Sequence, residues 1–169
     1  KLLYSEQGEM LFTHFGVSGP VVLSASAHIK DLSKKYRLVI DLKPALSIDM
    51  LDKRILREIE DNRLQSYKNM LCSLMPKSLA EEFAQISGID KDETVGNITK
   101  EQREHIAKLL KNIEIHVKGM RPFEEAIVTK GGVCVKEINP KTMESKIVKN
   151  LYFAGEIIDV DAYTGGFNL

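Results

Sequence analysis

The chain of 169 residues ends in the stretch Leu151–Leu169, which has the sequence LYFAGEIIDVDAYTGGFNL. Its first four residues are apolar and include aromatic side chains, a pattern typical of a short buried strand. Gly155 interrupts this apolar run. Three acidic residues follow it, namely Glu156, Asp159 and Asp161. Near the end stands the pair Gly165–Gly166, where a backbone without Cβ lets another group approach closely. A strand end followed by acids and glycines is a common arrangement around nucleotide-type cofactors.

Composition is that of an ordinary globular protein, with 43% apolar and 28% charged residues. Lys+Arg and Asp+Glu are both 24, so the formal net charge is zero. A zero charge argues against binding to nucleic acid or an anionic membrane through bulk charge. No apolar run approaches the roughly 20 residues that span a bilayer. We therefore expect a cytoplasmic protein with no nucleic-acid or membrane partner. The oligomeric state is left open.

Cysteine and histidine spacing does not indicate a metal site or a disulfide framework. Cys72 and Cys134 lie far apart, and no Cys-x-x-Cys motif is present. We expect two unpaired thiols in a reducing compartment, with a reactive or cofactor-linked thiol as the less favoured alternative. The histidines are scattered without metal-ligand spacing, at positions His14, His28, His105 and His116. The sequence therefore predicts no structural metal.

Residues 47–112 carry apolar side chains at helical spacing and predict a compact unit of three or four helices. Ser47 is expected to cap the first helix, and Thr99 with Gln102 to form a capping box before the last. Gly88 is expected to end the helix that precedes this box. The apolar stripes are Leu51, Ile55, Leu56 and Ile59, then Leu79, Phe83 and Ile86, then Ile106, Leu109, Leu110 and Ile113. Such stripes are better explained as a core than as a cofactor site.

Strict alternation returns at Ile113–Val117 and predicts a strand on which Glu114 and His116 share one face. Further strands are predicted at residues 126–129, 133–135 and 151–154. Before the helical block, two short strands are predicted around a turn at Gln7–Gly8, and a third over Tyr36–Leu42. We expect the strands before and after the helices to pair with each other. The predicted class is α+β, with a small antiparallel sheet or barrel interrupted by helices.

The loop Thr13–Pro20, THFGVSGP, precedes a predicted helix that runs to about Asp31. Pro20 suits the first helical position, where its missing N–H costs nothing. The favoured interpretation is a strand-to-helix turn capped by Ser18 or Gly19. The alternative is a contact with an anion or substrate at the start of the helix. A Gly-x-Ser-x-Gly nucleophile elbow is excluded, because Pro20 stands where that motif requires glycine.

Three blocks of the sequence, in their order and spacing, resemble one known family. The blocks are Phe12–Pro20 (FTHFGVSGP), Thr129–Val133 (TKGGV) with Asn139–Ser145 (NPKTMES), and Leu151–Leu169. They resemble the BaiN/RdsA-type family of bacterial FAD-dependent oxidoreductases. The resemblance covers the whole chain, and the third block is its most specific part.

The resemblance implies a particular division of the chain. Residues 1–46 and 113–124 would form a β-barrel insertion domain, and residues 47–112 a helical subdomain within it. Residues 125–169 would be a partial C-terminal return of a Rossmann-type FAD-binding domain. The Gly-x-Gly-x-x-Gly segment that binds the FAD pyrophosphate in this family is absent from the sequence. We therefore expect an excised piece of a larger protein, inactive by itself, whose partner is the rest of its own FAD-binding domain.

The resemblance also implies a set of cofactor-binding residues. Glu156 follows Ala154-Gly155 at the place where related flavoproteins offer an acid to the ribityl hydroxyls, and Asp159 is its rival. A local cap or salt bridge is the alternative role for either acid. The full set of candidates is Gly131, Gly132, Gly155, Glu156, Asp159, Thr164, Gly165, Gly166, Phe167 and Asn168. The glycines and Thr164 would bring backbone N–H groups to the flavin.

The implied activity is hydride transfer from NAD(P)H through FAD to a small organic acceptor, which is the expected substrate. No catalytic acid or base is chosen, although Tyr163 and His14 are conceivable proton donors. The competing hypothesis is a non-catalytic substrate lid or interaction module. A nucleic-acid-binding module is a third and weaker alternative, since small β-barrels serve that role but the net charge is zero.

Overall fold

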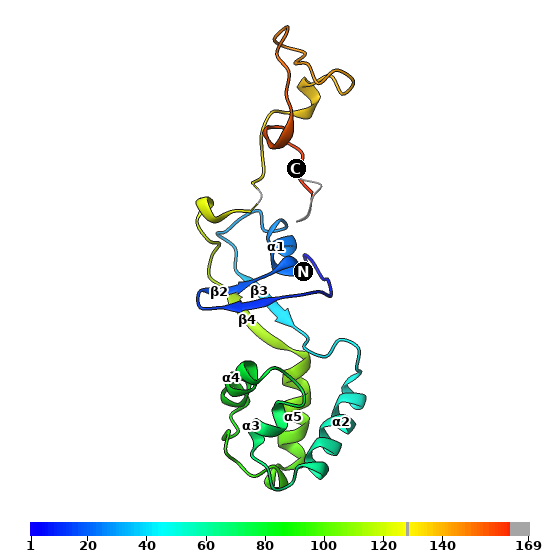
Figure 1. Cartoon of the computed structure of the whole chain (residues 1–169), viewed down its shortest axis with the longest axis vertical. Coiled ribbons are helices and arrows are strands. Elements are labelled where there is room, and N and C mark those ends of the chain that lie inside the picture. Colours follow the sequence, from blue (N-terminus) through cyan, green and yellow to red (C-terminus); the bar gives the residue numbers. More distant parts are fainter. Residues whose placement is uncertain (128, 163–169) are drawn as a thin grey trace. The chain divides into compact units, whose positions relative to one another are not determined.

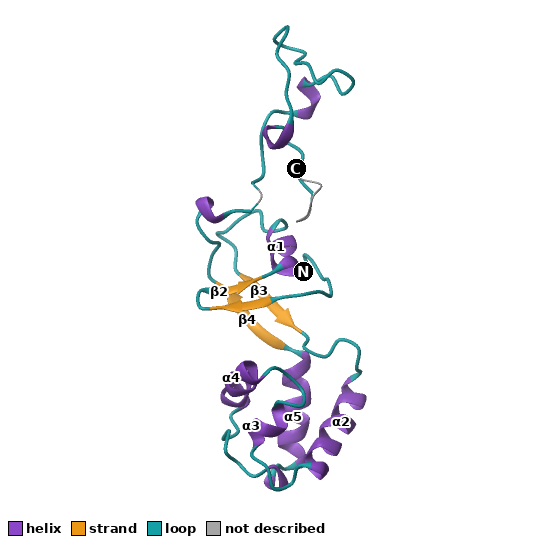
Figure 2. Ribbon diagram, viewed as in Figure 1, coloured by secondary structure: helices purple, strands orange, loops and turns teal. Residues whose placement is uncertain are grey.

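The computed structural model describes residues 1–127 and 129–162 (Figure 1). The chain divides into two compact units, one formed by Tyr36–Val117 and the other by Lys1–Lys35 with the residues from Lys118 onward. Helices and small antiparallel sheets both occur in the described residues (Figure 2). The coarse α+β class is therefore correct. The finer division into residues 1–46 with 113–124, 47–112 and 125–169 stays a prediction.

The unit Tyr36–Val117 is a group of helices whose two ends are joined by a pair of strands. Its elements are β3 (Tyr36–Ile40), α2 (Ile48–Asp61), α3 (Tyr67–Leu71), α4 (Lys77–Ser87), the 3₁₀ turn η1 (Val95–Asn97), α5 (Lys100–Lys111) and β4 (Ile113–Val117). β3 pairs antiparallel with β4, from Tyr36 opposite Val117 to Ile40 opposite Ile113. The predicted pairing of strands across the helical block is confirmed. The strand pair closes the unit because it brings both ends of the helical block together.

Glu114 and His116 share one face of β4, as predicted, and both are exposed. Arg37 on β3 donates from Nη1 to both carboxylate oxygens of Glu114, at 3.0 and 2.9 Å. The side-chain amide of Asn112 donates to the same carboxylate, and with Arg37 it lowers the pKa of Glu114. These contacts reinforce the pairing of β3 with β4, as charged cross-strand pairs commonly do.

Local capping signals place the helix ends of this unit. The Ser47 hydroxyl accepts a hydrogen bond from the Met50 N–H at 3.3 Å. Thr99 Oγ1 accepts from the Gln102 N–H at 3.2 Å, and Gln102 Oε1 accepts from the Thr99 N–H at 2.8 Å. Gly88 ends α4 with a φ of 71°. All three predicted caps are confirmed, because capping depends on chemistry within one helical turn.

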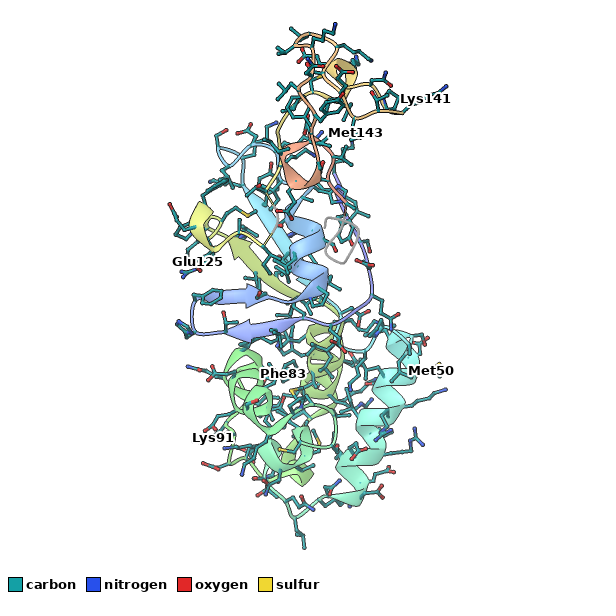
Figure 3. All side chains as sticks on the ribbon, turned by 45° about the horizontal axis from the view of Figure 1, so that its top comes forward. Met50, Phe83, Lys91, Glu125, Lys141 and Met143 are labelled. Atoms are coloured by element: carbon teal, nitrogen blue, oxygen red, sulfur yellow. The ribbon has the colours of Figure 1, made fainter. Side chains whose placement is uncertain are left out.

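The core of the unit is formed by apolar side chains that its helices enclose. Those buried to below 2% exposure are Tyr67, Phe83, Leu51, Ile55, Met70, Leu71, Ile106, Leu110 and Val95. Figure 3 shows Phe83 among the helices. Each such side chain contributes about 1.5–3 kcal/mol through burial. The apolar stripes predicted from the sequence thus form a core rather than a cofactor site.

One predicted face was wrong. Ile86 was expected on the buried side of α4 but is 56% exposed. The buried face of this helix carries small residues beside one aromatic, namely Ala80, Phe83, Ala84 and Ser87. Small side chains let α4 pack against α3, and a hydrophobicity pattern gives Ala and Ser too little weight to reveal this.

Tyr67 is the one fully buried side chain of this core with a hydroxyl among the residues described. Its hydroxyl donates to Ser87 Oγ at 3.2 Å, and Ser87 Oγ donates in turn to the Ala84 carbonyl at 2.7 Å. Burial raises the pKa of Tyr67 to about 12, against the smaller lowering effect of the Ser87 hydrogen bond. The phenol therefore stays neutral in the folded unit until strongly alkaline pH.

The other unit begins with a β-hairpin and a short helix. β1 (Leu11–Thr13) pairs antiparallel with β2 (Gly16–Ser18), and α1 (Pro20–Ser26) follows. The predicted turn at Gln7–Gly8 was wrong, since the strands turn at residues 14 and 15. Gly8 has a different role, because a Cβ there would lie 2.5 Å from Val21 Cγ2. The predicted helix to Asp31 also ends early, at Ser26.

The later part of this unit has turns where strands were predicted. Its helical elements are the 3₁₀ turns η2 (Phe123–Glu125), η3 (Val135–Glu137) and η4 (Gly155–Ile157). The strands predicted at residues 126–129, 133–135 and 151–154 are absent from the described residues, and within these three ranges only isolated bridges at Val133 and Tyr152 occur. No closed barrel forms in residues 1–127 and 129–162, because β1–β2 and β3–β4 are separate pairs. Short strands without further partners rarely persist as a sheet.

Candidate functional site

Two segments that carry predicted site residues run side by side. The Val133 N–H donates to the Ile157 carbonyl at 2.8 Å, and the Asp159 N–H donates to the Val133 carbonyl at 3.0 Å. These bonds form a parallel bridge between Val133 and Ile158. Residues 131–133 and 155–159, far apart in the sequence, therefore meet. We call these two segments and their bonds the glycine–acid ladder.

Gly132 is the point of closest approach within this ladder. Its φ is 145°, and a Cβ built on it would lie 2.4 Å from the Ile157 carbonyl oxygen and 3.0 Å from the Asp159 nitrogen. Real Cβ atoms essentially never come so near to backbone atoms, so only glycine allows the two segments to meet here. The contact that Gly132 permits is therefore one between two parts of the chain.

Gly131 and Gly155 differ from Gly132 in their surroundings. Their φ values are 108° and 77°, which residues with a Cβ rarely adopt. No described atom comes within 4 Å of the position that a Cβ would take at either glycine. The backbone at these two positions is therefore open to the approach of another group.

The two candidate carboxylates lie on the second segment of the ladder. Glu156 is part of η4 and Asp159 follows it, and both side chains are exposed. Within residues 1–127 and 129–162, neither carboxylate forms an ion pair or caps a helix. Both therefore retain their full capacity to accept hydrogen bonds from hydroxyl groups. This leaves the choice between Glu156 and Asp159 open.

The third acid of this stretch has a partner that sequence reasoning missed. Lys130 Nζ lies 3.3 Å from Asp161 Oδ2, so the residue before the glycine pair is joined to the residue beyond the ladder. The sequence shows a lysine beside Gly131 and a cluster of acids, but no periodicity relates positions 31 residues apart. Only the structure assigns Asp161 to this ion pair.

A tight turn supports the chain that leads into Gly155. Met143 and Asn150 adopt φ values of 61° and 64°. The Phe153 N–H donates to the Met143 carbonyl at 3.0 Å, and the Asn150 N–H donates to Glu144 Oε1 at 2.8 Å. The turn predicted at Asn139–Thr142 is confirmed, and Figure 3 shows Met143 and Lys141 on it. Left-handed backbone at two non-glycine residues shows that the local bonds over-determine this conformation.

The start of α1 does not offer the anion contact that was the alternative for this loop. The Val21 N–H donates to the Glu9 carbonyl at 3.3 Å. A Cβ on Gly19 would lie 3.1 Å from the Leu11 nitrogen and 3.1 Å from Met10 Cα. The chain itself thus occupies the helix start, which favours the strand-to-helix turn.

His14 lies at the turn of the β1–β2 hairpin, away from the ladder contacts. Its ring meets Phe15 edge-on with 5.1 Å between centroids. The Arg121 guanidinium lies 4.5 Å from the centre of the Phe15 ring and forms an ion pair with Glu125 at 2.6 Å. These contacts tie the hairpin to the residues that follow Val117. They do not bring His14 to the candidate carboxylates.

Part of the predicted site lies outside the described residues. This applies to Tyr163 and to the candidates Thr164, Gly165, Gly166, Phe167 and Asn168. Their roles remain predictions. In the described residues no group of three His, Cys, Asp or Glu side chains is placed to hold a metal ion. Cys72 and Cys134 are exposed and not joined to each other. None of the helices in residues 1–127 and 129–162 is long and apolar enough to cross a membrane.

Comparison with known proteins places these features in a family. Residues 1–128 match the family described as HI0933-like protein barrel and H2TH domain. The chain belongs to the HI0933-like family. The predicted resemblance to BaiN/RdsA-type proteins is thereby confirmed. The glycine–acid ladder lies beyond residue 128, outside the part that this HI0933-like domain covers.

Three relatives of this HI0933-like chain extend the comparison. It is 36% identical over 160 residues to the ribosomal RNA dihydrouridine synthase of Haemophilus influenzae, covering 95% of the chain and 38% of the relative. It is 32% identical over 160 residues to the protein of the same name in Escherichia coli, covering 94% and 38%. It is 28% identical over 172 residues to the 3-dehydro-bile acid delta(4,6)-reductase of Clostridium scindens, covering 100% and 42%.

These alignments indicate the enzyme class of the family, but they cover only part of each relative. The three relatives carry the names of oxidoreductases, which supports an oxidoreductase family. The chain spans about two-fifths of the length of the curated relatives that it matches. With 160 of 169 residues aligned, the similarity also reaches into the segment that contains the glycine–acid ladder.

Proposed function

We propose that this chain belongs to an FAD-dependent oxidoreductase that moves hydride from NAD(P)H through FAD to a small organic acceptor. One observation carries the proposal. The glycine–acid ladder joins the open backbone at Gly131 and Gly155 to the exposed carboxylates of Glu156 and Asp159. Membership of a family whose relatives bear the names of oxidoreductases supports the same conclusion.

The residues present fit a flavin in their chemistry. A carboxylate accepts two hydroxyl hydrogen bonds, as the ribityl chain requires, and Glu156 is our first choice for this role. Open glycine backbone at Gly131 and Gly155 lets an aromatic ring or a phosphate approach. Thr164, Gly165 and Gly166 would add backbone N–H donors, with Phe167 and Asn168 as weaker candidates. When bound, FAD supplies the hydride-transfer chemistry, and the protein binds, orients and shields it.

The chain needs a partner for this role. Its sequence contains no Gly-x-Gly-x-x-Gly, the segment whose backbone holds the pyrophosphate at a helix start. We propose that the rest of its own FAD-binding domain provides this segment and completes a Rossmann-type domain around residues 125–169. The barrel named in the family description would likewise be closed in the whole protein.

A small organic acceptor is our proposal for the substrate, in preference to nucleic acid. The formal net charge is zero. Basic side chains of the helical unit such as Arg54, Lys68 and Arg103 already face carboxylates, at 2.7, 2.9 and 2.8 Å. A surface arranged in this way attracts phosphates weakly. Two relatives are named for ribosomal RNA, so the assay must include both classes of acceptor.

A second candidate function is a substrate lid or interaction module without catalytic groups. The helical unit favours this function, because its apolar stripes form its own core and leave no apolar stripe to line a catalytic site. For the 169-residue chain by itself we expect this passive behaviour. Addition of FAD should give no stoichiometric complex, and NADH should not be oxidised.

The deciding experiment is to express the chain together with the FAD-binding segments of its full-length protein and record the visible spectrum. We expect oxidised-flavin bands that bleach when NADH or NADPH is added without oxygen. A colourless protein that stays without flavin bands after incubation with FAD would overturn the proposal. Re-oxidation by a steroid-like enone or by ribosomal RNA would then separate the two acceptor classes. Tight FAD binding by the 169-residue chain would contradict its proposed dependence on a partner.

A further inference from the structure

The ion pair between Lys130 and Asp161 stands at the candidate site without a role in the proposed function. Lys130 precedes Gly131 and Gly132, whose positive φ values turn the chain at the start of the glycine–acid ladder. Asp161 lies two residues beyond Asp159, which forms the last hydrogen bond between the two segments. The ion pair, at 3.3 Å, therefore links the two segments at a point separate from their backbone hydrogen bonds.

The ion pair lies in a group of negatively charged side chains. Glu156, Asp159 and Asp161 place three carboxylates within six residues, and like charges so near one another repel. Lys130 compensates one of them and leaves the other two without a described partner. The turn at Gly131 and Gly132 loses much conformational freedom when it is ordered, because glycine has the largest such freedom to lose.

We propose that Lys130 and Asp161 are positioning residues of the candidate cofactor site. Their ion pair holds the turn at Gly131 and Gly132 against residues 155–159. The open glycine backbone and the exposed carboxylates of Glu156 and Asp159 thereby keep a fixed position relative to each other. Asp161 is accordingly a tether and not a cofactor ligand. The inference rests on the proposed function for the identity of the ligand, whereas the tether itself can be tested without any cofactor.

The first test uses amide hydrogen exchange in the 169-residue chain, measured by NMR at low salt. The reporters are the Val133 and Asp159 N–H groups of the ladder. In Lys130→Met and Asp161→Asn we expect both amides to exchange up to about fivefold faster, the range for one exposed ion pair. Lys130→Arg should retain the wild-type rates. The charge exchange Lys130→Asp with Asp161→Lys should restore them.

Lys141 provides the matched control, because it is an exposed lysine of the same unit with no ion pair to any described residue. Figure 3 shows it on the turn that precedes Met143. Lys141→Met should leave both amides unchanged. If Lys130→Met behaves like this control, or if the wild-type amides show no protection, the positioning role is refuted.

The second test measures FAD affinity in the protein that includes its FAD-binding segments, by quenching of flavin fluorescence. We expect Lys130→Met to weaken binding about two- to fivefold, and the charge exchange to recover it. Unchanged affinity in Lys130→Met would refute the link between the tether and the cofactor. Failure of the wild-type protein to bind FAD would instead refute the proposed function, and the exchange rates would still decide on the tether.

Discussion

The helical unit Tyr36–Val117 and the described residues from Lys118 onward use their apolar side chains in opposite ways. The helical unit encloses a continuous core that includes Tyr67 and Phe83. The other stretch buries Ile138 but leaves large apolar side chains exposed, namely Met120, Phe123, Ile127, Val135, Ile147, Val148, Leu151, Tyr152, Ile157 and Val160. Extended exposed apolar surface is typical of a face that binds another element, so we expect a covering element here. The helical unit therefore covers its own apolar side chains, whereas the stretch from Lys118 onward, which we call the site segment, leaves most of its large apolar side chains uncovered in the described residues.

The largest expected effect tests whether the helical unit is stabilised by its own core. Phe83→Ala should lower the free energy of unfolding by about 3–5 kcal/mol, since it removes a fully buried aromatic ring. Ile86→Ala on the same helix is the control and should change it by about 0.5 kcal/mol or less. Urea unfolding followed by circular dichroism measures both. Similar losses in the two variants would mean that the assigned faces of α4 are wrong.

Alkaline pH provides the next test of the same core. Tyr67 has a pKa raised to about 12 in the folded unit and an ordinary value near 10 when unfolded. The contribution of Tyr67 to the free energy of unfolding is therefore fully present below about pH 10. It is lost as the pH rises toward 12, by about 2–3 kcal/mol for two pKa units. Urea unfolding between pH 9 and 12 should show this loss.

Tyr67→Phe supplies the control for the pH experiment. It removes the titrating hydroxyl while Ser87 keeps its bond to the Ala84 carbonyl. The fall in stability above about pH 10 should be smaller in this variant. An identical pH profile in Tyr67→Phe and wild type would assign the alkaline loss to other groups.

In the site segment, two glycines offer a matched pair. Gly132→Ala and Gly131→Ala both place a Cβ on a residue of positive φ, but only the first places it against the Ile157 carbonyl. Gly132→Ala should abolish exchange protection at Val133 and Asp159, and weaken FAD binding about tenfold or more in the protein with its FAD-binding segments. Gly131→Ala should keep the ladder protected. Equal loss of protection would show that backbone strain, and not close approach, controls the ladder.

The carboxylates give a smaller and more specific effect. Glu156→Gln should weaken FAD binding by about five- to tenfold, because it removes a charge-assisted acceptor for the ribityl hydroxyls. Asp159→Asn should change the affinity by about twofold or less. Isothermal titration of FAD into the complete protein compares the two variants directly. The reverse order would transfer the proposed role from Glu156 to Asp159.

The smallest expected effect concerns an exposed apolar residue of the site segment. Ile147 is 71% exposed, so Ile147→Ser should alter the stability of the 169-residue chain by about 0.5 kcal/mol or less. In the protein with its FAD-binding segments, the same change should lower the thermal midpoint, because the partner would then cover a hydroxyl. No difference between the two contexts would contradict a covered surface at this position.

Much of the helical unit could be predicted from local signals. Ser47, Gly88 and the Thr99–Gln102 box act within one turn of the chain, so their chemistry is visible in a short window. The pairing of β3 with β4 followed from alternation on both sides of the block. The errors arose where contacts with a segment distant in the sequence determine the role of a residue. Gly8 lies against Val21 instead of forming the predicted hairpin turn. On α4, small residues rather than Ile86 form the buried face, which packs against α3.

The sequence by itself determined the family, the helical unit with its caps, and the kinds of side chain available at the candidate site. Only the tertiary structure decided how those side chains are used. It made Gly132 a contact between two segments, left Gly131 and Gly155 open, and paired Asp161 with Lys130. The physical reason is that these roles depend on distances between residues more than twenty positions apart. Hydrophobic periodicity and capping carry no information about residues so far apart in the sequence. Backbone hydrogen bonds between the two segments, in contrast, define the distances between such residues to within tenths of an ångström.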